Sequence, residues 1–233
     1  MSVRDNIEKI NAVKDAAAEK AGRKGSDVLL CAVTKTHPAS LINEAIDAGI
    51  TDIGENKVQE ILEKYDDVKP VRWHMIGHLQ TNKVKYIIDK VSMIHSVDSY
   101  KLAEEIDKRA AQHGIVMDIL IQVNSAMEES KFGITTEETG RLIDEILENC
   151  HHVRIRGLMC IAPFSEDPQD AAEYFRAVKD IYDRYEGVKR EGLDFKYLSM
   201  GMSNDFETAI AEGSNLVRIG TAIFGKRDYS KSV

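Results

Sequence analysis

With 233 residues, of which 43% are hydrophobic and 30% charged, the chain has the composition of an ordinary soluble globular protein, and its length suits one barrel-type domain or two small ones. Its net charge of −8 and its three cysteines without metal-like spacing argue against nucleic acid as a partner and indicate reduced thiols. No apolar run approaches the ~20 residues that cross a bilayer, and the N-terminus has no apolar signal core, so we expect a cytoplasmic protein without a membrane partner.

Strand patterns and helix patterns alternate along nearly the whole chain. A first helix is expected over residues 2–22, where Ile7, Ile10, Val13 and Ala17 recur at three- and four-residue spacing. Eight runs rich in β-branched residues follow, and we interpret them as the strands Val28–Lys35, Thr51–Glu55, Arg72–Gly77, Ser92–Val97, Met117–Asn124, Val153–Ile161, Lys196–Met200 and Leu216–Phe224. The predicted helices between them are Ala39–Ala48, a stretch ending near Tyr65, Thr81–Asp89, Tyr100–Gln112, Glu137–Cys150, Gln169–Tyr185 and Asp205–Glu212.

This alternation predicts an α/β fold with a parallel sheet, and repetition to eight favours closure into a (β/α)8 TIM barrel. No Gly-x-Gly-x-x-Gly follows the first strand, which weakens the alternative of an open dinucleotide-binding sheet. The chain has four prolines and no linker-like stretch. We therefore predict one domain over residues 1–233, a single-domain barrel with an extra N-terminal helix.

Lys35, at the end of the first predicted strand, is the sharpest candidate for chemistry. Because side chains alternate along a strand, Leu29, Cys31, Val33 and Lys35 share one face. If Val33 points into the barrel, so does Lys35, whose pKa would fall with lost hydration, and the neutral amine could attack a carbonyl. The alternative is an ordinary lysine that reaches solvent from a strand end.

Two small-residue turns follow the seventh and eighth strands. Met202 and Ser203 lie in the first turn, and Gly220 and Thr221 in the second. Backbone N–H groups at such turns suit an anion, and barrel enzymes often hold phosphate after these two strands. Acidic residues that follow Ser203 closely count against phosphate in the first turn, where Ser203 could also serve only as a helix cap. A lysine facing a phosphate cradle across the barrel mouth suits a cofactor that carries an aldehyde and a phosphate.

Arg218 lies inside the eighth predicted strand, between Val217 and Ile219. An outward-facing arginine would pair with a helix carboxylate, whereas an inward-facing one demands a buried partner. A pyridine nitrogen is one such partner. Because arginine stays protonated, it would leave that nitrogen unprotonated, which suits holding a cofactor better than broad carbanion chemistry.

Two further polar residues lie near strand ends. His74, in the third strand, could be a general base, although an isolated strand histidine is more often a hydrogen-bonded structural residue. Asn56 follows the second strand and could reach a ring hydroxyl, or it could simply form a turn. We find no histidine and carboxylate spacing that indicates a metal site.

Taken in order, several segments resemble the pyridoxal phosphate homeostasis protein family, the single-domain relatives of the alanine racemase N-terminal barrel. The resemblance covers nearly the whole chain from Val28 to Tyr229, and its specific segments are Ala32–Thr36, Gly54–Asn56, Trp73–Lys83, Gly157–Met159 with Ala162–Pro163, Leu198–Ser203 and Val217–Gly225. A departure from the family pattern is Ser125-Ala126-Met127 after the fifth strand.

The resemblance implies that pyridoxal 5'-phosphate forms a Schiff base with Lys35. It implies that Ser203, Gly220 and Thr221 hold the phosphate, that Arg218 faces the pyridine nitrogen and that Asn56 lies near the ring. His74 and Met202 complete our set of candidate cofactor-binding residues, and we assign no catalytic residue. Lys131 and Lys231 are candidates for a second, weaker cofactor contact.

Family members are thought to bind and hand over the cofactor, with apo forms of pyridoxal phosphate enzymes as possible recipients. The second domain that supplies the racemase tyrosine is not expected here, so we favour a non-catalytic, monomeric carrier. The alternatives are a slow pyridoxal phosphate-dependent racemase, transaminase or lyase, and a cofactor-free barrel enzyme that uses a Schiff-base lysine on a phosphorylated sugar.

Overall fold

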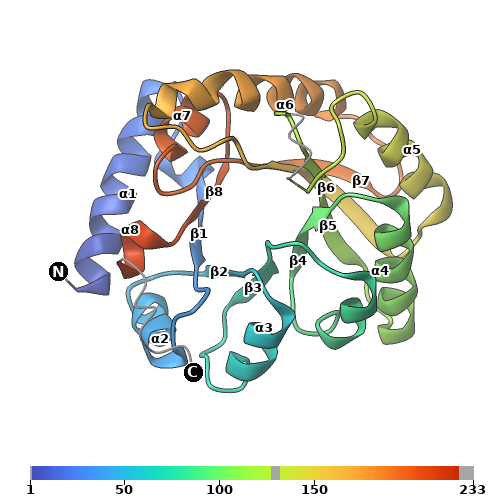
Figure 1. The fold of residues 1–233 in the computed structure, drawn as a ribbon, viewed down its shortest axis with the longest axis horizontal. Coiled ribbons are helices and arrows are strands. Elements are labelled where there is room, and N and C mark those ends of the chain that lie inside the picture. Colours follow the sequence, from blue (N-terminus) through green and yellow to red (C-terminus); the bar gives the residue numbers. More distant parts are fainter. Residues whose placement is uncertain (1, 127–131, 226–233) are drawn as a thin grey trace.

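A closed ring of eight parallel strands surrounds the centre of the molecule (Figure 1). The structure is a computed structural model, and it describes residues 2–126 and 132–225. The strands pair in sequence order, and β1 pairs with both β2 and β8 to close the barrel. They are β1 (Leu29–Val33), β2 (Asp52–Glu55), β3 (Arg72–Met75), β4 (Met93–Val97), β5 (Met117–Val123), β6 (Val153–Cys160), β7 (Leu193–Ser199) and β8 (Leu216–Ile219). The predicted (β/α)8 barrel is confirmed.

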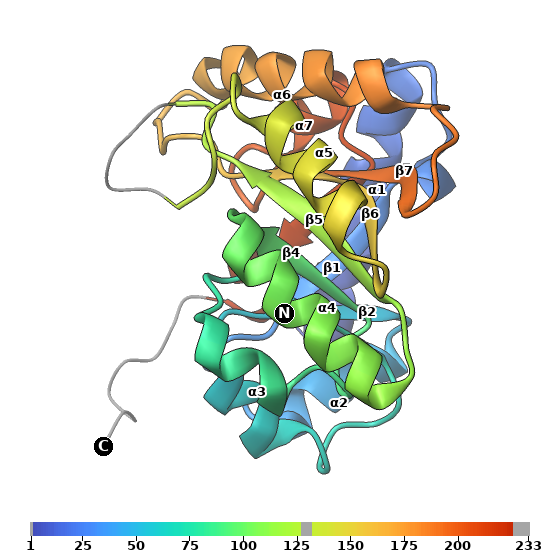
Figure 2. The ribbon, with the colours of Figure 1, turned by 90° about the vertical axis from the view of Figure 1, so that its right-hand side faces the viewer.

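Helices cover the outside of the ring (Figure 2). The α-helices are α1 (Val3–Lys20), α2 (Ala39–Asp47), α3 (Val58–Lys64), α4 (Tyr100–His113), α5 (Thr139–Asn149), α6 (Ala172–Tyr185), α7 (Phe206–Ala211) and α8 (Thr221–Phe224). Three short 3-10 helices are η1 (Gly25–Asp27), η2 (Thr81–Tyr86) and η3 (Pro168–Ala171). Within the described ranges, no helix combines the length and apolar character that crossing a bilayer requires.

Several predicted boundaries were wrong. The strand expected over Leu216–Phe224 ends at Ile219, and α8 follows, because Ile223 is buried in a helical turn whose carbonyl accepts a hydrogen bond from Asn6 of α1 at 2.8 Å. The helix expected over Thr81–Asp89 is the 3-10 helix η2, since buried residues three apart satisfy either helix type. β7 begins at Leu193, three residues before the predicted start, and β1 ends at Val33.

Alternation along the strands divides the buried side chains into two sets. The large apolar core lies between strands and helices, and it takes Leu30 and Ala32 from β1 and Trp73 and Met75 from β3. A second, small cluster joins Met93, Leu120 and Met159 from three strands, with Tyr197 packed against it. The remaining inward positions are largely polar, namely Asp52, His74, His95, Ser199 and Arg218. The barrel interior therefore carries charge and hydrogen-bonding groups that the outer core lacks.

The N-terminal helix α1 packs against α7 and α8, the helices that follow β7 and β8. Arg23, just beyond α1, donates to the carbonyl of Ser214 at 2.9 Å and also bonds the carbonyl of Ile210 near the end of α7. Unpaired carbonyls at a helix C-terminus favour a cation there. The extra helix thus braces the last two βα units of the barrel.

Candidate functional site

The turn after β1 directs Lys35 toward the barrel mouth. Thr36 follows it with φ of 67°, a left-handed conformation that is uncommon for a threonine. The backbone N–H of Thr36 donates to Oε2 of Glu60 in α3 at 2.6 Å, and this bond holds the turn. Strained backbone of this kind is often found next to functional groups.

A buried ion cluster supports this turn from the outer side of the strands. Lys64 of α3 donates to Oε1 of Glu55 at 2.8 Å and to Oε2 of Glu60 at 2.7 Å. Burial raises the pKa of Glu55 against the opposing effect of Lys64. Burial also acts to raise the pKa of Glu60, but hydrogen bonds from Lys64 and the Thr36 N–H and the Lys64 charge hold it below its usual value. Lys64 therefore holds the Glu60 carboxylate in the position where it accepts the hydrogen bond from the Thr36 N–H.

The turn after β7 is built around Gly201. Its φ is 89°, and a Cβ there would lie 2.6 Å from the Cβ of Ala209, so glycine permits the close approach of the turn to α7. Asp205 bonds the Met202 N–H at 2.6 Å, and burial raises the pKa of this carboxyl. The side chain of Ser203 accepts a 3.4 Å contact from the backbone N–H of Ala222, which ties this turn to the first turn of α8.

Arg218 points into the barrel and is 4% exposed. Its NH1 donates to the carbonyl and hydroxyl of Ser199 at 2.8 and 2.6 Å, and its NH2 donates to the carbonyl of Cys160 at 2.8 Å. A guanidinium has five N–H donors, so among the described residues these bonds leave two for a ligand. Burial lowers the pKa of Arg218, and the side chain remains a cation.

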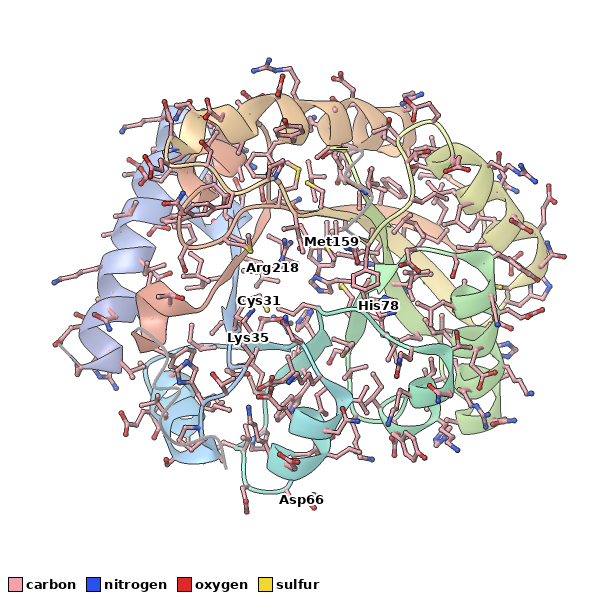
Figure 3. All side chains as sticks on the ribbon, in the orientation of Figure 1. Cys31, Lys35, Asp66, His78, Met159 and Arg218 are labelled. Atoms are coloured by element: carbon pink, nitrogen blue, oxygen red, sulfur yellow. The ribbon has the colours of Figure 1, made fainter. Side chains whose placement is uncertain are left out.

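These groups meet in one pocket of about 210 Å³ at the carboxyl ends of β1, β7 and β8. Figure 3 shows Lys35 and Arg218 inside the ring of strands, with Asp66 outside it. Six of the eight predicted cofactor-binding residues line the pocket, and they are Lys35, Met202, Ser203, Arg218, Gly220 and Thr221. The pocket thus presents an amine, a guanidinium, two hydroxyls and small-residue backbone to one ligand smaller than a typical drug molecule.

The other two predicted residues do not line this pocket. Asn56 follows β2 and is half-buried, and its backbone packs against Gly77. His74 lies inside the barrel, with Nε2 2.9 Å from Oδ1 of Asp52 and Nδ1 2.9 Å from Nε2 of His95. Because both ring nitrogens are engaged within the protein, His74 has no free nitrogen to act as a base in the pocket. Lys131 and Lys231 lie outside the described residues.

Four pocket residues were not predicted from the sequence, and they are Val33, His37, Asn204 and Gly225. His37 stands two positions after Lys35, and its ring centroid lies 4.8 Å from that of Phe224. The alternation that singled out Lys35 already includes Val33, so that residue could have been inferred. His37 lies beyond the strand, where alternation no longer applies.

A larger cavity of about 530 Å³ lies at the opposite end of the barrel, lined by Val28, Thr51 and Arg72 at the starts of strands. Barrel enzymes place their chemistry at the carboxyl ends of strands, and residues at the amino ends mainly serve stability. The smaller pocket is therefore the candidate site, because position and side-chain chemistry agree there.

The comparisons with known proteins agree with this geometry. Residues 7–228 match the family described as alanine racemase, N-terminal domain. The chain is 46% identical over 216 residues to a pyridoxal phosphate homeostasis protein of Aquifex aeolicus, covering 91% of this chain and 93% of that protein.

Two solved structures are similar over almost the whole chain. A protein from Bifidobacterium adolescentis has 36% identity and a TM-score of 0.89, with 95% of this chain and 94% of that one covered. PipY of Synechococcus elongatus, solved with pyridoxal phosphate bound, has 32% identity and a TM-score of 0.75, with 91% and 100% covered. The chain therefore belongs to the alanine racemase N-terminal domain family, and within it to the pyridoxal phosphate homeostasis proteins.

Proposed function

We propose that this protein binds pyridoxal 5'-phosphate in the pocket at the carboxyl ends of β1, β7 and β8, as a Schiff base on Lys35. We propose further that it holds the cofactor as a carrier in intracellular cofactor homeostasis. The observation that carries the proposal is the convergence of Lys35, Arg218 and the two small-residue turns on one pocket of about 210 Å³. An aldehyde, a ring nitrogen and a phosphate are the three groups that these side chains can satisfy together.

Each pocket residue has a role in this proposal. Lys35 would hold the cofactor through its aldehyde as a Schiff base, with release of water, and Ser203, Gly220 and Thr221 would hold the phosphate. Arg218 donates to the ring nitrogen. Met202 packs at the edge of the pocket. Asn56 and His74 do not line the pocket, and their contact with the cofactor stays a prediction.

The charged side chains of the pocket are positive, whereas the chain as a whole is negative. The protein carries −8 overall, yet Lys35 and Arg218 supply the ionic side chains of the pocket. Two cations and the backbone N–H groups of the turns favour a phosphate dianion locally. Binding should therefore depend on these groups rather than on long-range attraction.

When bound, the cofactor supplies an electrophilic carbon and a ring that withdraws electrons. Arg218 keeps its own proton, so the ring nitrogen remains unprotonated and the ring withdraws electrons weakly. His74 bonds Asp52 and His95 through its two ring nitrogens and has no free nitrogen for proton exchange on a substrate. These features favour storage and transfer of the cofactor over rapid turnover.

The rest of the proposal concerns the cell. We place the protein in the cytoplasm as a monomer, with apo forms of pyridoxal phosphate enzymes as recipients. The reduced state expected of its cysteines supports the compartment.

The direct test is borohydride reduction of the loaded protein followed by peptide mass mapping. Covalent label is expected on Lys35, with loss of the visible absorbance band. Lys35→Ala should remove label and band while the fold persists, and Lys101→Ala, on the exposed face of α4, should retain both. Label on another lysine in the wild-type protein would refute the assignment.

A second measurement separates a carrier from an enzyme. The loaded protein is incubated with L-alanine and other amino acids, and the products are resolved by chirality. Trace conversion is expected, because Arg218 leaves the ring nitrogen unprotonated and the ring then withdraws electrons weakly. Turnover on the order of 1–10³ per second would reject the carrier proposal.

A further inference from the structure

A line of hydrogen-bonded side chains crosses the barrel interior beneath the pocket. Asp52 of β2 lies 2.9 Å from His74 of β3, and His74 lies 2.9 Å from His95 of β4. Nδ1 of His95 lies 3.3 Å from the hydroxyl of Ser199 in β7, which accepts the 2.6 Å bond from Arg218 in β8. Five strands thus contribute one residue each to a continuous chain that ends at the pocket.

With both imidazoles neutral, the two ends of this chain fix the direction of its hydrogen bonds. Arginine can only donate and an ionised carboxylate can only accept. The Ser199 hydroxyl therefore accepts from Arg218 and donates to Nδ1 of His95. Nε2–H of His95 then donates to Nδ1 of His74, whose Nε2–H donates to Asp52. In this arrangement both imidazoles carry their proton on Nε2.

The charges around the chain agree with this assignment. Burial, assisted by the positive charge of Arg218, holds the pKa of His95 well below its usual value. Burial acts to raise the pKa of Asp52, but hydrogen bonds from His74, Arg72 and Thr51 hold it well below its usual value. The carboxylate is thus ionised and the imidazole next to Ser199 is neutral, as the direction of the chain requires.

We propose that Ser199 and His95 are positioning residues that aim Arg218 at the cofactor, and that Asp52 and His74 lock the tautomer of His95 on which this depends. The inference rests on the proposed function. Ser199 accepts twice from NH1 of Arg218, through its carbonyl and its hydroxyl. His95 orients that hydroxyl by accepting its proton, so the lone pair of the hydroxyl faces the guanidinium. The two remaining N–H donors of Arg218 then point to the pocket.

The test compares two buried hydroxyls. Ser199→Ala removes the link between Arg218 and His95, with a change of one atom in a strand. Ser96→Ala is the matched control, because its hydroxyl, one residue from His95, is fully buried and has no hydrogen-bond partner among the described residues. Folding is checked by circular dichroism and thermal unfolding, and the dissociation constant of pyridoxal phosphate by absorbance titration.

Ser199→Ala is expected to weaken cofactor binding about tenfold, which corresponds to about 1.4 kcal/mol, while Ser96→Ala stays within about twofold of the wild-type protein. A purely structural role for the chain predicts a lower unfolding temperature with unchanged affinity. Equal affinity of Ser199→Ala and the wild-type protein would overturn the inference.

A second measurement needs no cofactor. In the ¹⁵N-histidine-labelled apo protein, His95 should show the neutral Nε2–H pattern and should not titrate between about pH 5 and 8, where exposed histidines do. Ser199→Ala should shift the His95 signals, and Ser96→Ala should leave the tautomers unchanged. Mixed tautomers, or titration of His95 in that range, would overturn the tautomer lock.

The two hypotheses fail in different ways. If borohydride does not label the wild-type protein, the proposed function fails and the positioning role falls with it, while the apo spectra still decide the tautomer lock. If labelling of Lys35 is normal and Ser199→Ala binds like the wild-type protein, the positioning role alone fails.

Discussion

Replacement of Lys64 by methionine should both destabilise the fold and loosen the turn that carries Lys35. Methionine keeps most of the length and apolar volume of the side chain but removes the ammonium. The ammonium makes three hydrogen bonds, to the carbonyl of Thr34 at 3.1 Å and to the carboxylates of Glu55 and Glu60. The variant therefore leaves Glu55 as a buried charge without its cation.

The magnitude follows from burial. The Glu55 side chain is 0% exposed and that of Lys64 is 12% exposed, so this is a buried pair, and removal of one partner costs about 3–5 kcal/mol. At about 2–4 °C per kcal/mol for a chain of this size, the melting temperature should fall by about 6–20 °C. Cofactor affinity should fall as well, because Glu60 loses the cation that holds it against the Thr36 N–H.

The loss of stability should depend on pH. Without Lys64, the folded-state pKa of Glu55 rises further above its unfolded value, so the penalty exists where the unfolded carboxyl is ionised and vanishes below that value. The lowered pKa of Glu60 in the wild-type protein stabilises the fold above the unfolded-state value and is lost as pH falls through the folded one. The difference between the two proteins should thus be largest near neutral pH and shrink toward about pH 4.

Lys69→Met is the matched control, because Lys69 forms a 2.6 Å ion pair with Asp47 in which both side chains are about half exposed. An exposed pair contributes about 0–1 kcal/mol. Thermal and urea unfolding at neutral and acid pH measure both variants. If Lys64→Met costs no more than Lys69→Met at neutral pH, the buried ion cluster does not support the turn as described.

Three other outcomes are expected. Gly201→Ala should lower the free energy of unfolding by about 2–5 kcal/mol, because the position has a left-handed φ and the new Cβ would lie 2.6 Å from a neighbouring atom. The control is Gly114→Ala, with φ of 66° and open space around it, which should cost about 1–2 kcal/mol. Equal costs in thermal unfolding would contradict the close packing at Gly201. Asp52→Asn should lower the urea midpoint of unfolding at neutral pH. Burial acts to raise the pKa of Asp52, but hydrogen bonds from His74 and its neighbours hold it low, so the loss of stability should shrink below about pH 4. A loss that persists unchanged in acid would refute this. All three cysteines are buried and burial raises the pKa of each thiol, so a thiol reagent should label the native protein only as it unfolds, and rapid labelling would contradict the fold.

The strand order could be predicted because strand and helix patterns alternate eight times along the chain, and each pattern can be recognised locally. Each predicted strand overlaps an observed one, and the inward face that alternation gives Val33 and Lys35 agrees with their shared place in the pocket. The end of β8 was wrong for a physical reason. Ala222, Ile223 and Phe224 are apolar enough for a strand, and their helical turn depends on contact with α1, which lies more than 200 residues earlier in the chain.

The polar chain inside the barrel lay beyond sequence reasoning. His74 could be placed on an inward face, but its partners Asp52 and His95 come from other strands, and their distances depend on how far neighbouring strands are shifted against each other. In the structure His74 pairs with Gly54 of β2 and Met93 of β4. That register brings the two imidazoles within hydrogen-bonding distance, and no local pattern specifies it.

The position of the pocket between the first and last strands has a consequence for protein synthesis. Lys35 leaves the ribosome early, whereas Arg218 and Thr221 are among the last described residues to be made. At about 5–20 residues per second, roughly 10–40 s separate their appearance. During that interval the nascent chain holds an unpaired β1 edge and half a binding site. Capture of the vitamin B6 aldehyde can therefore begin only after translation is nearly complete, and ribosome-bound chains that stall before β8 should remain unloaded.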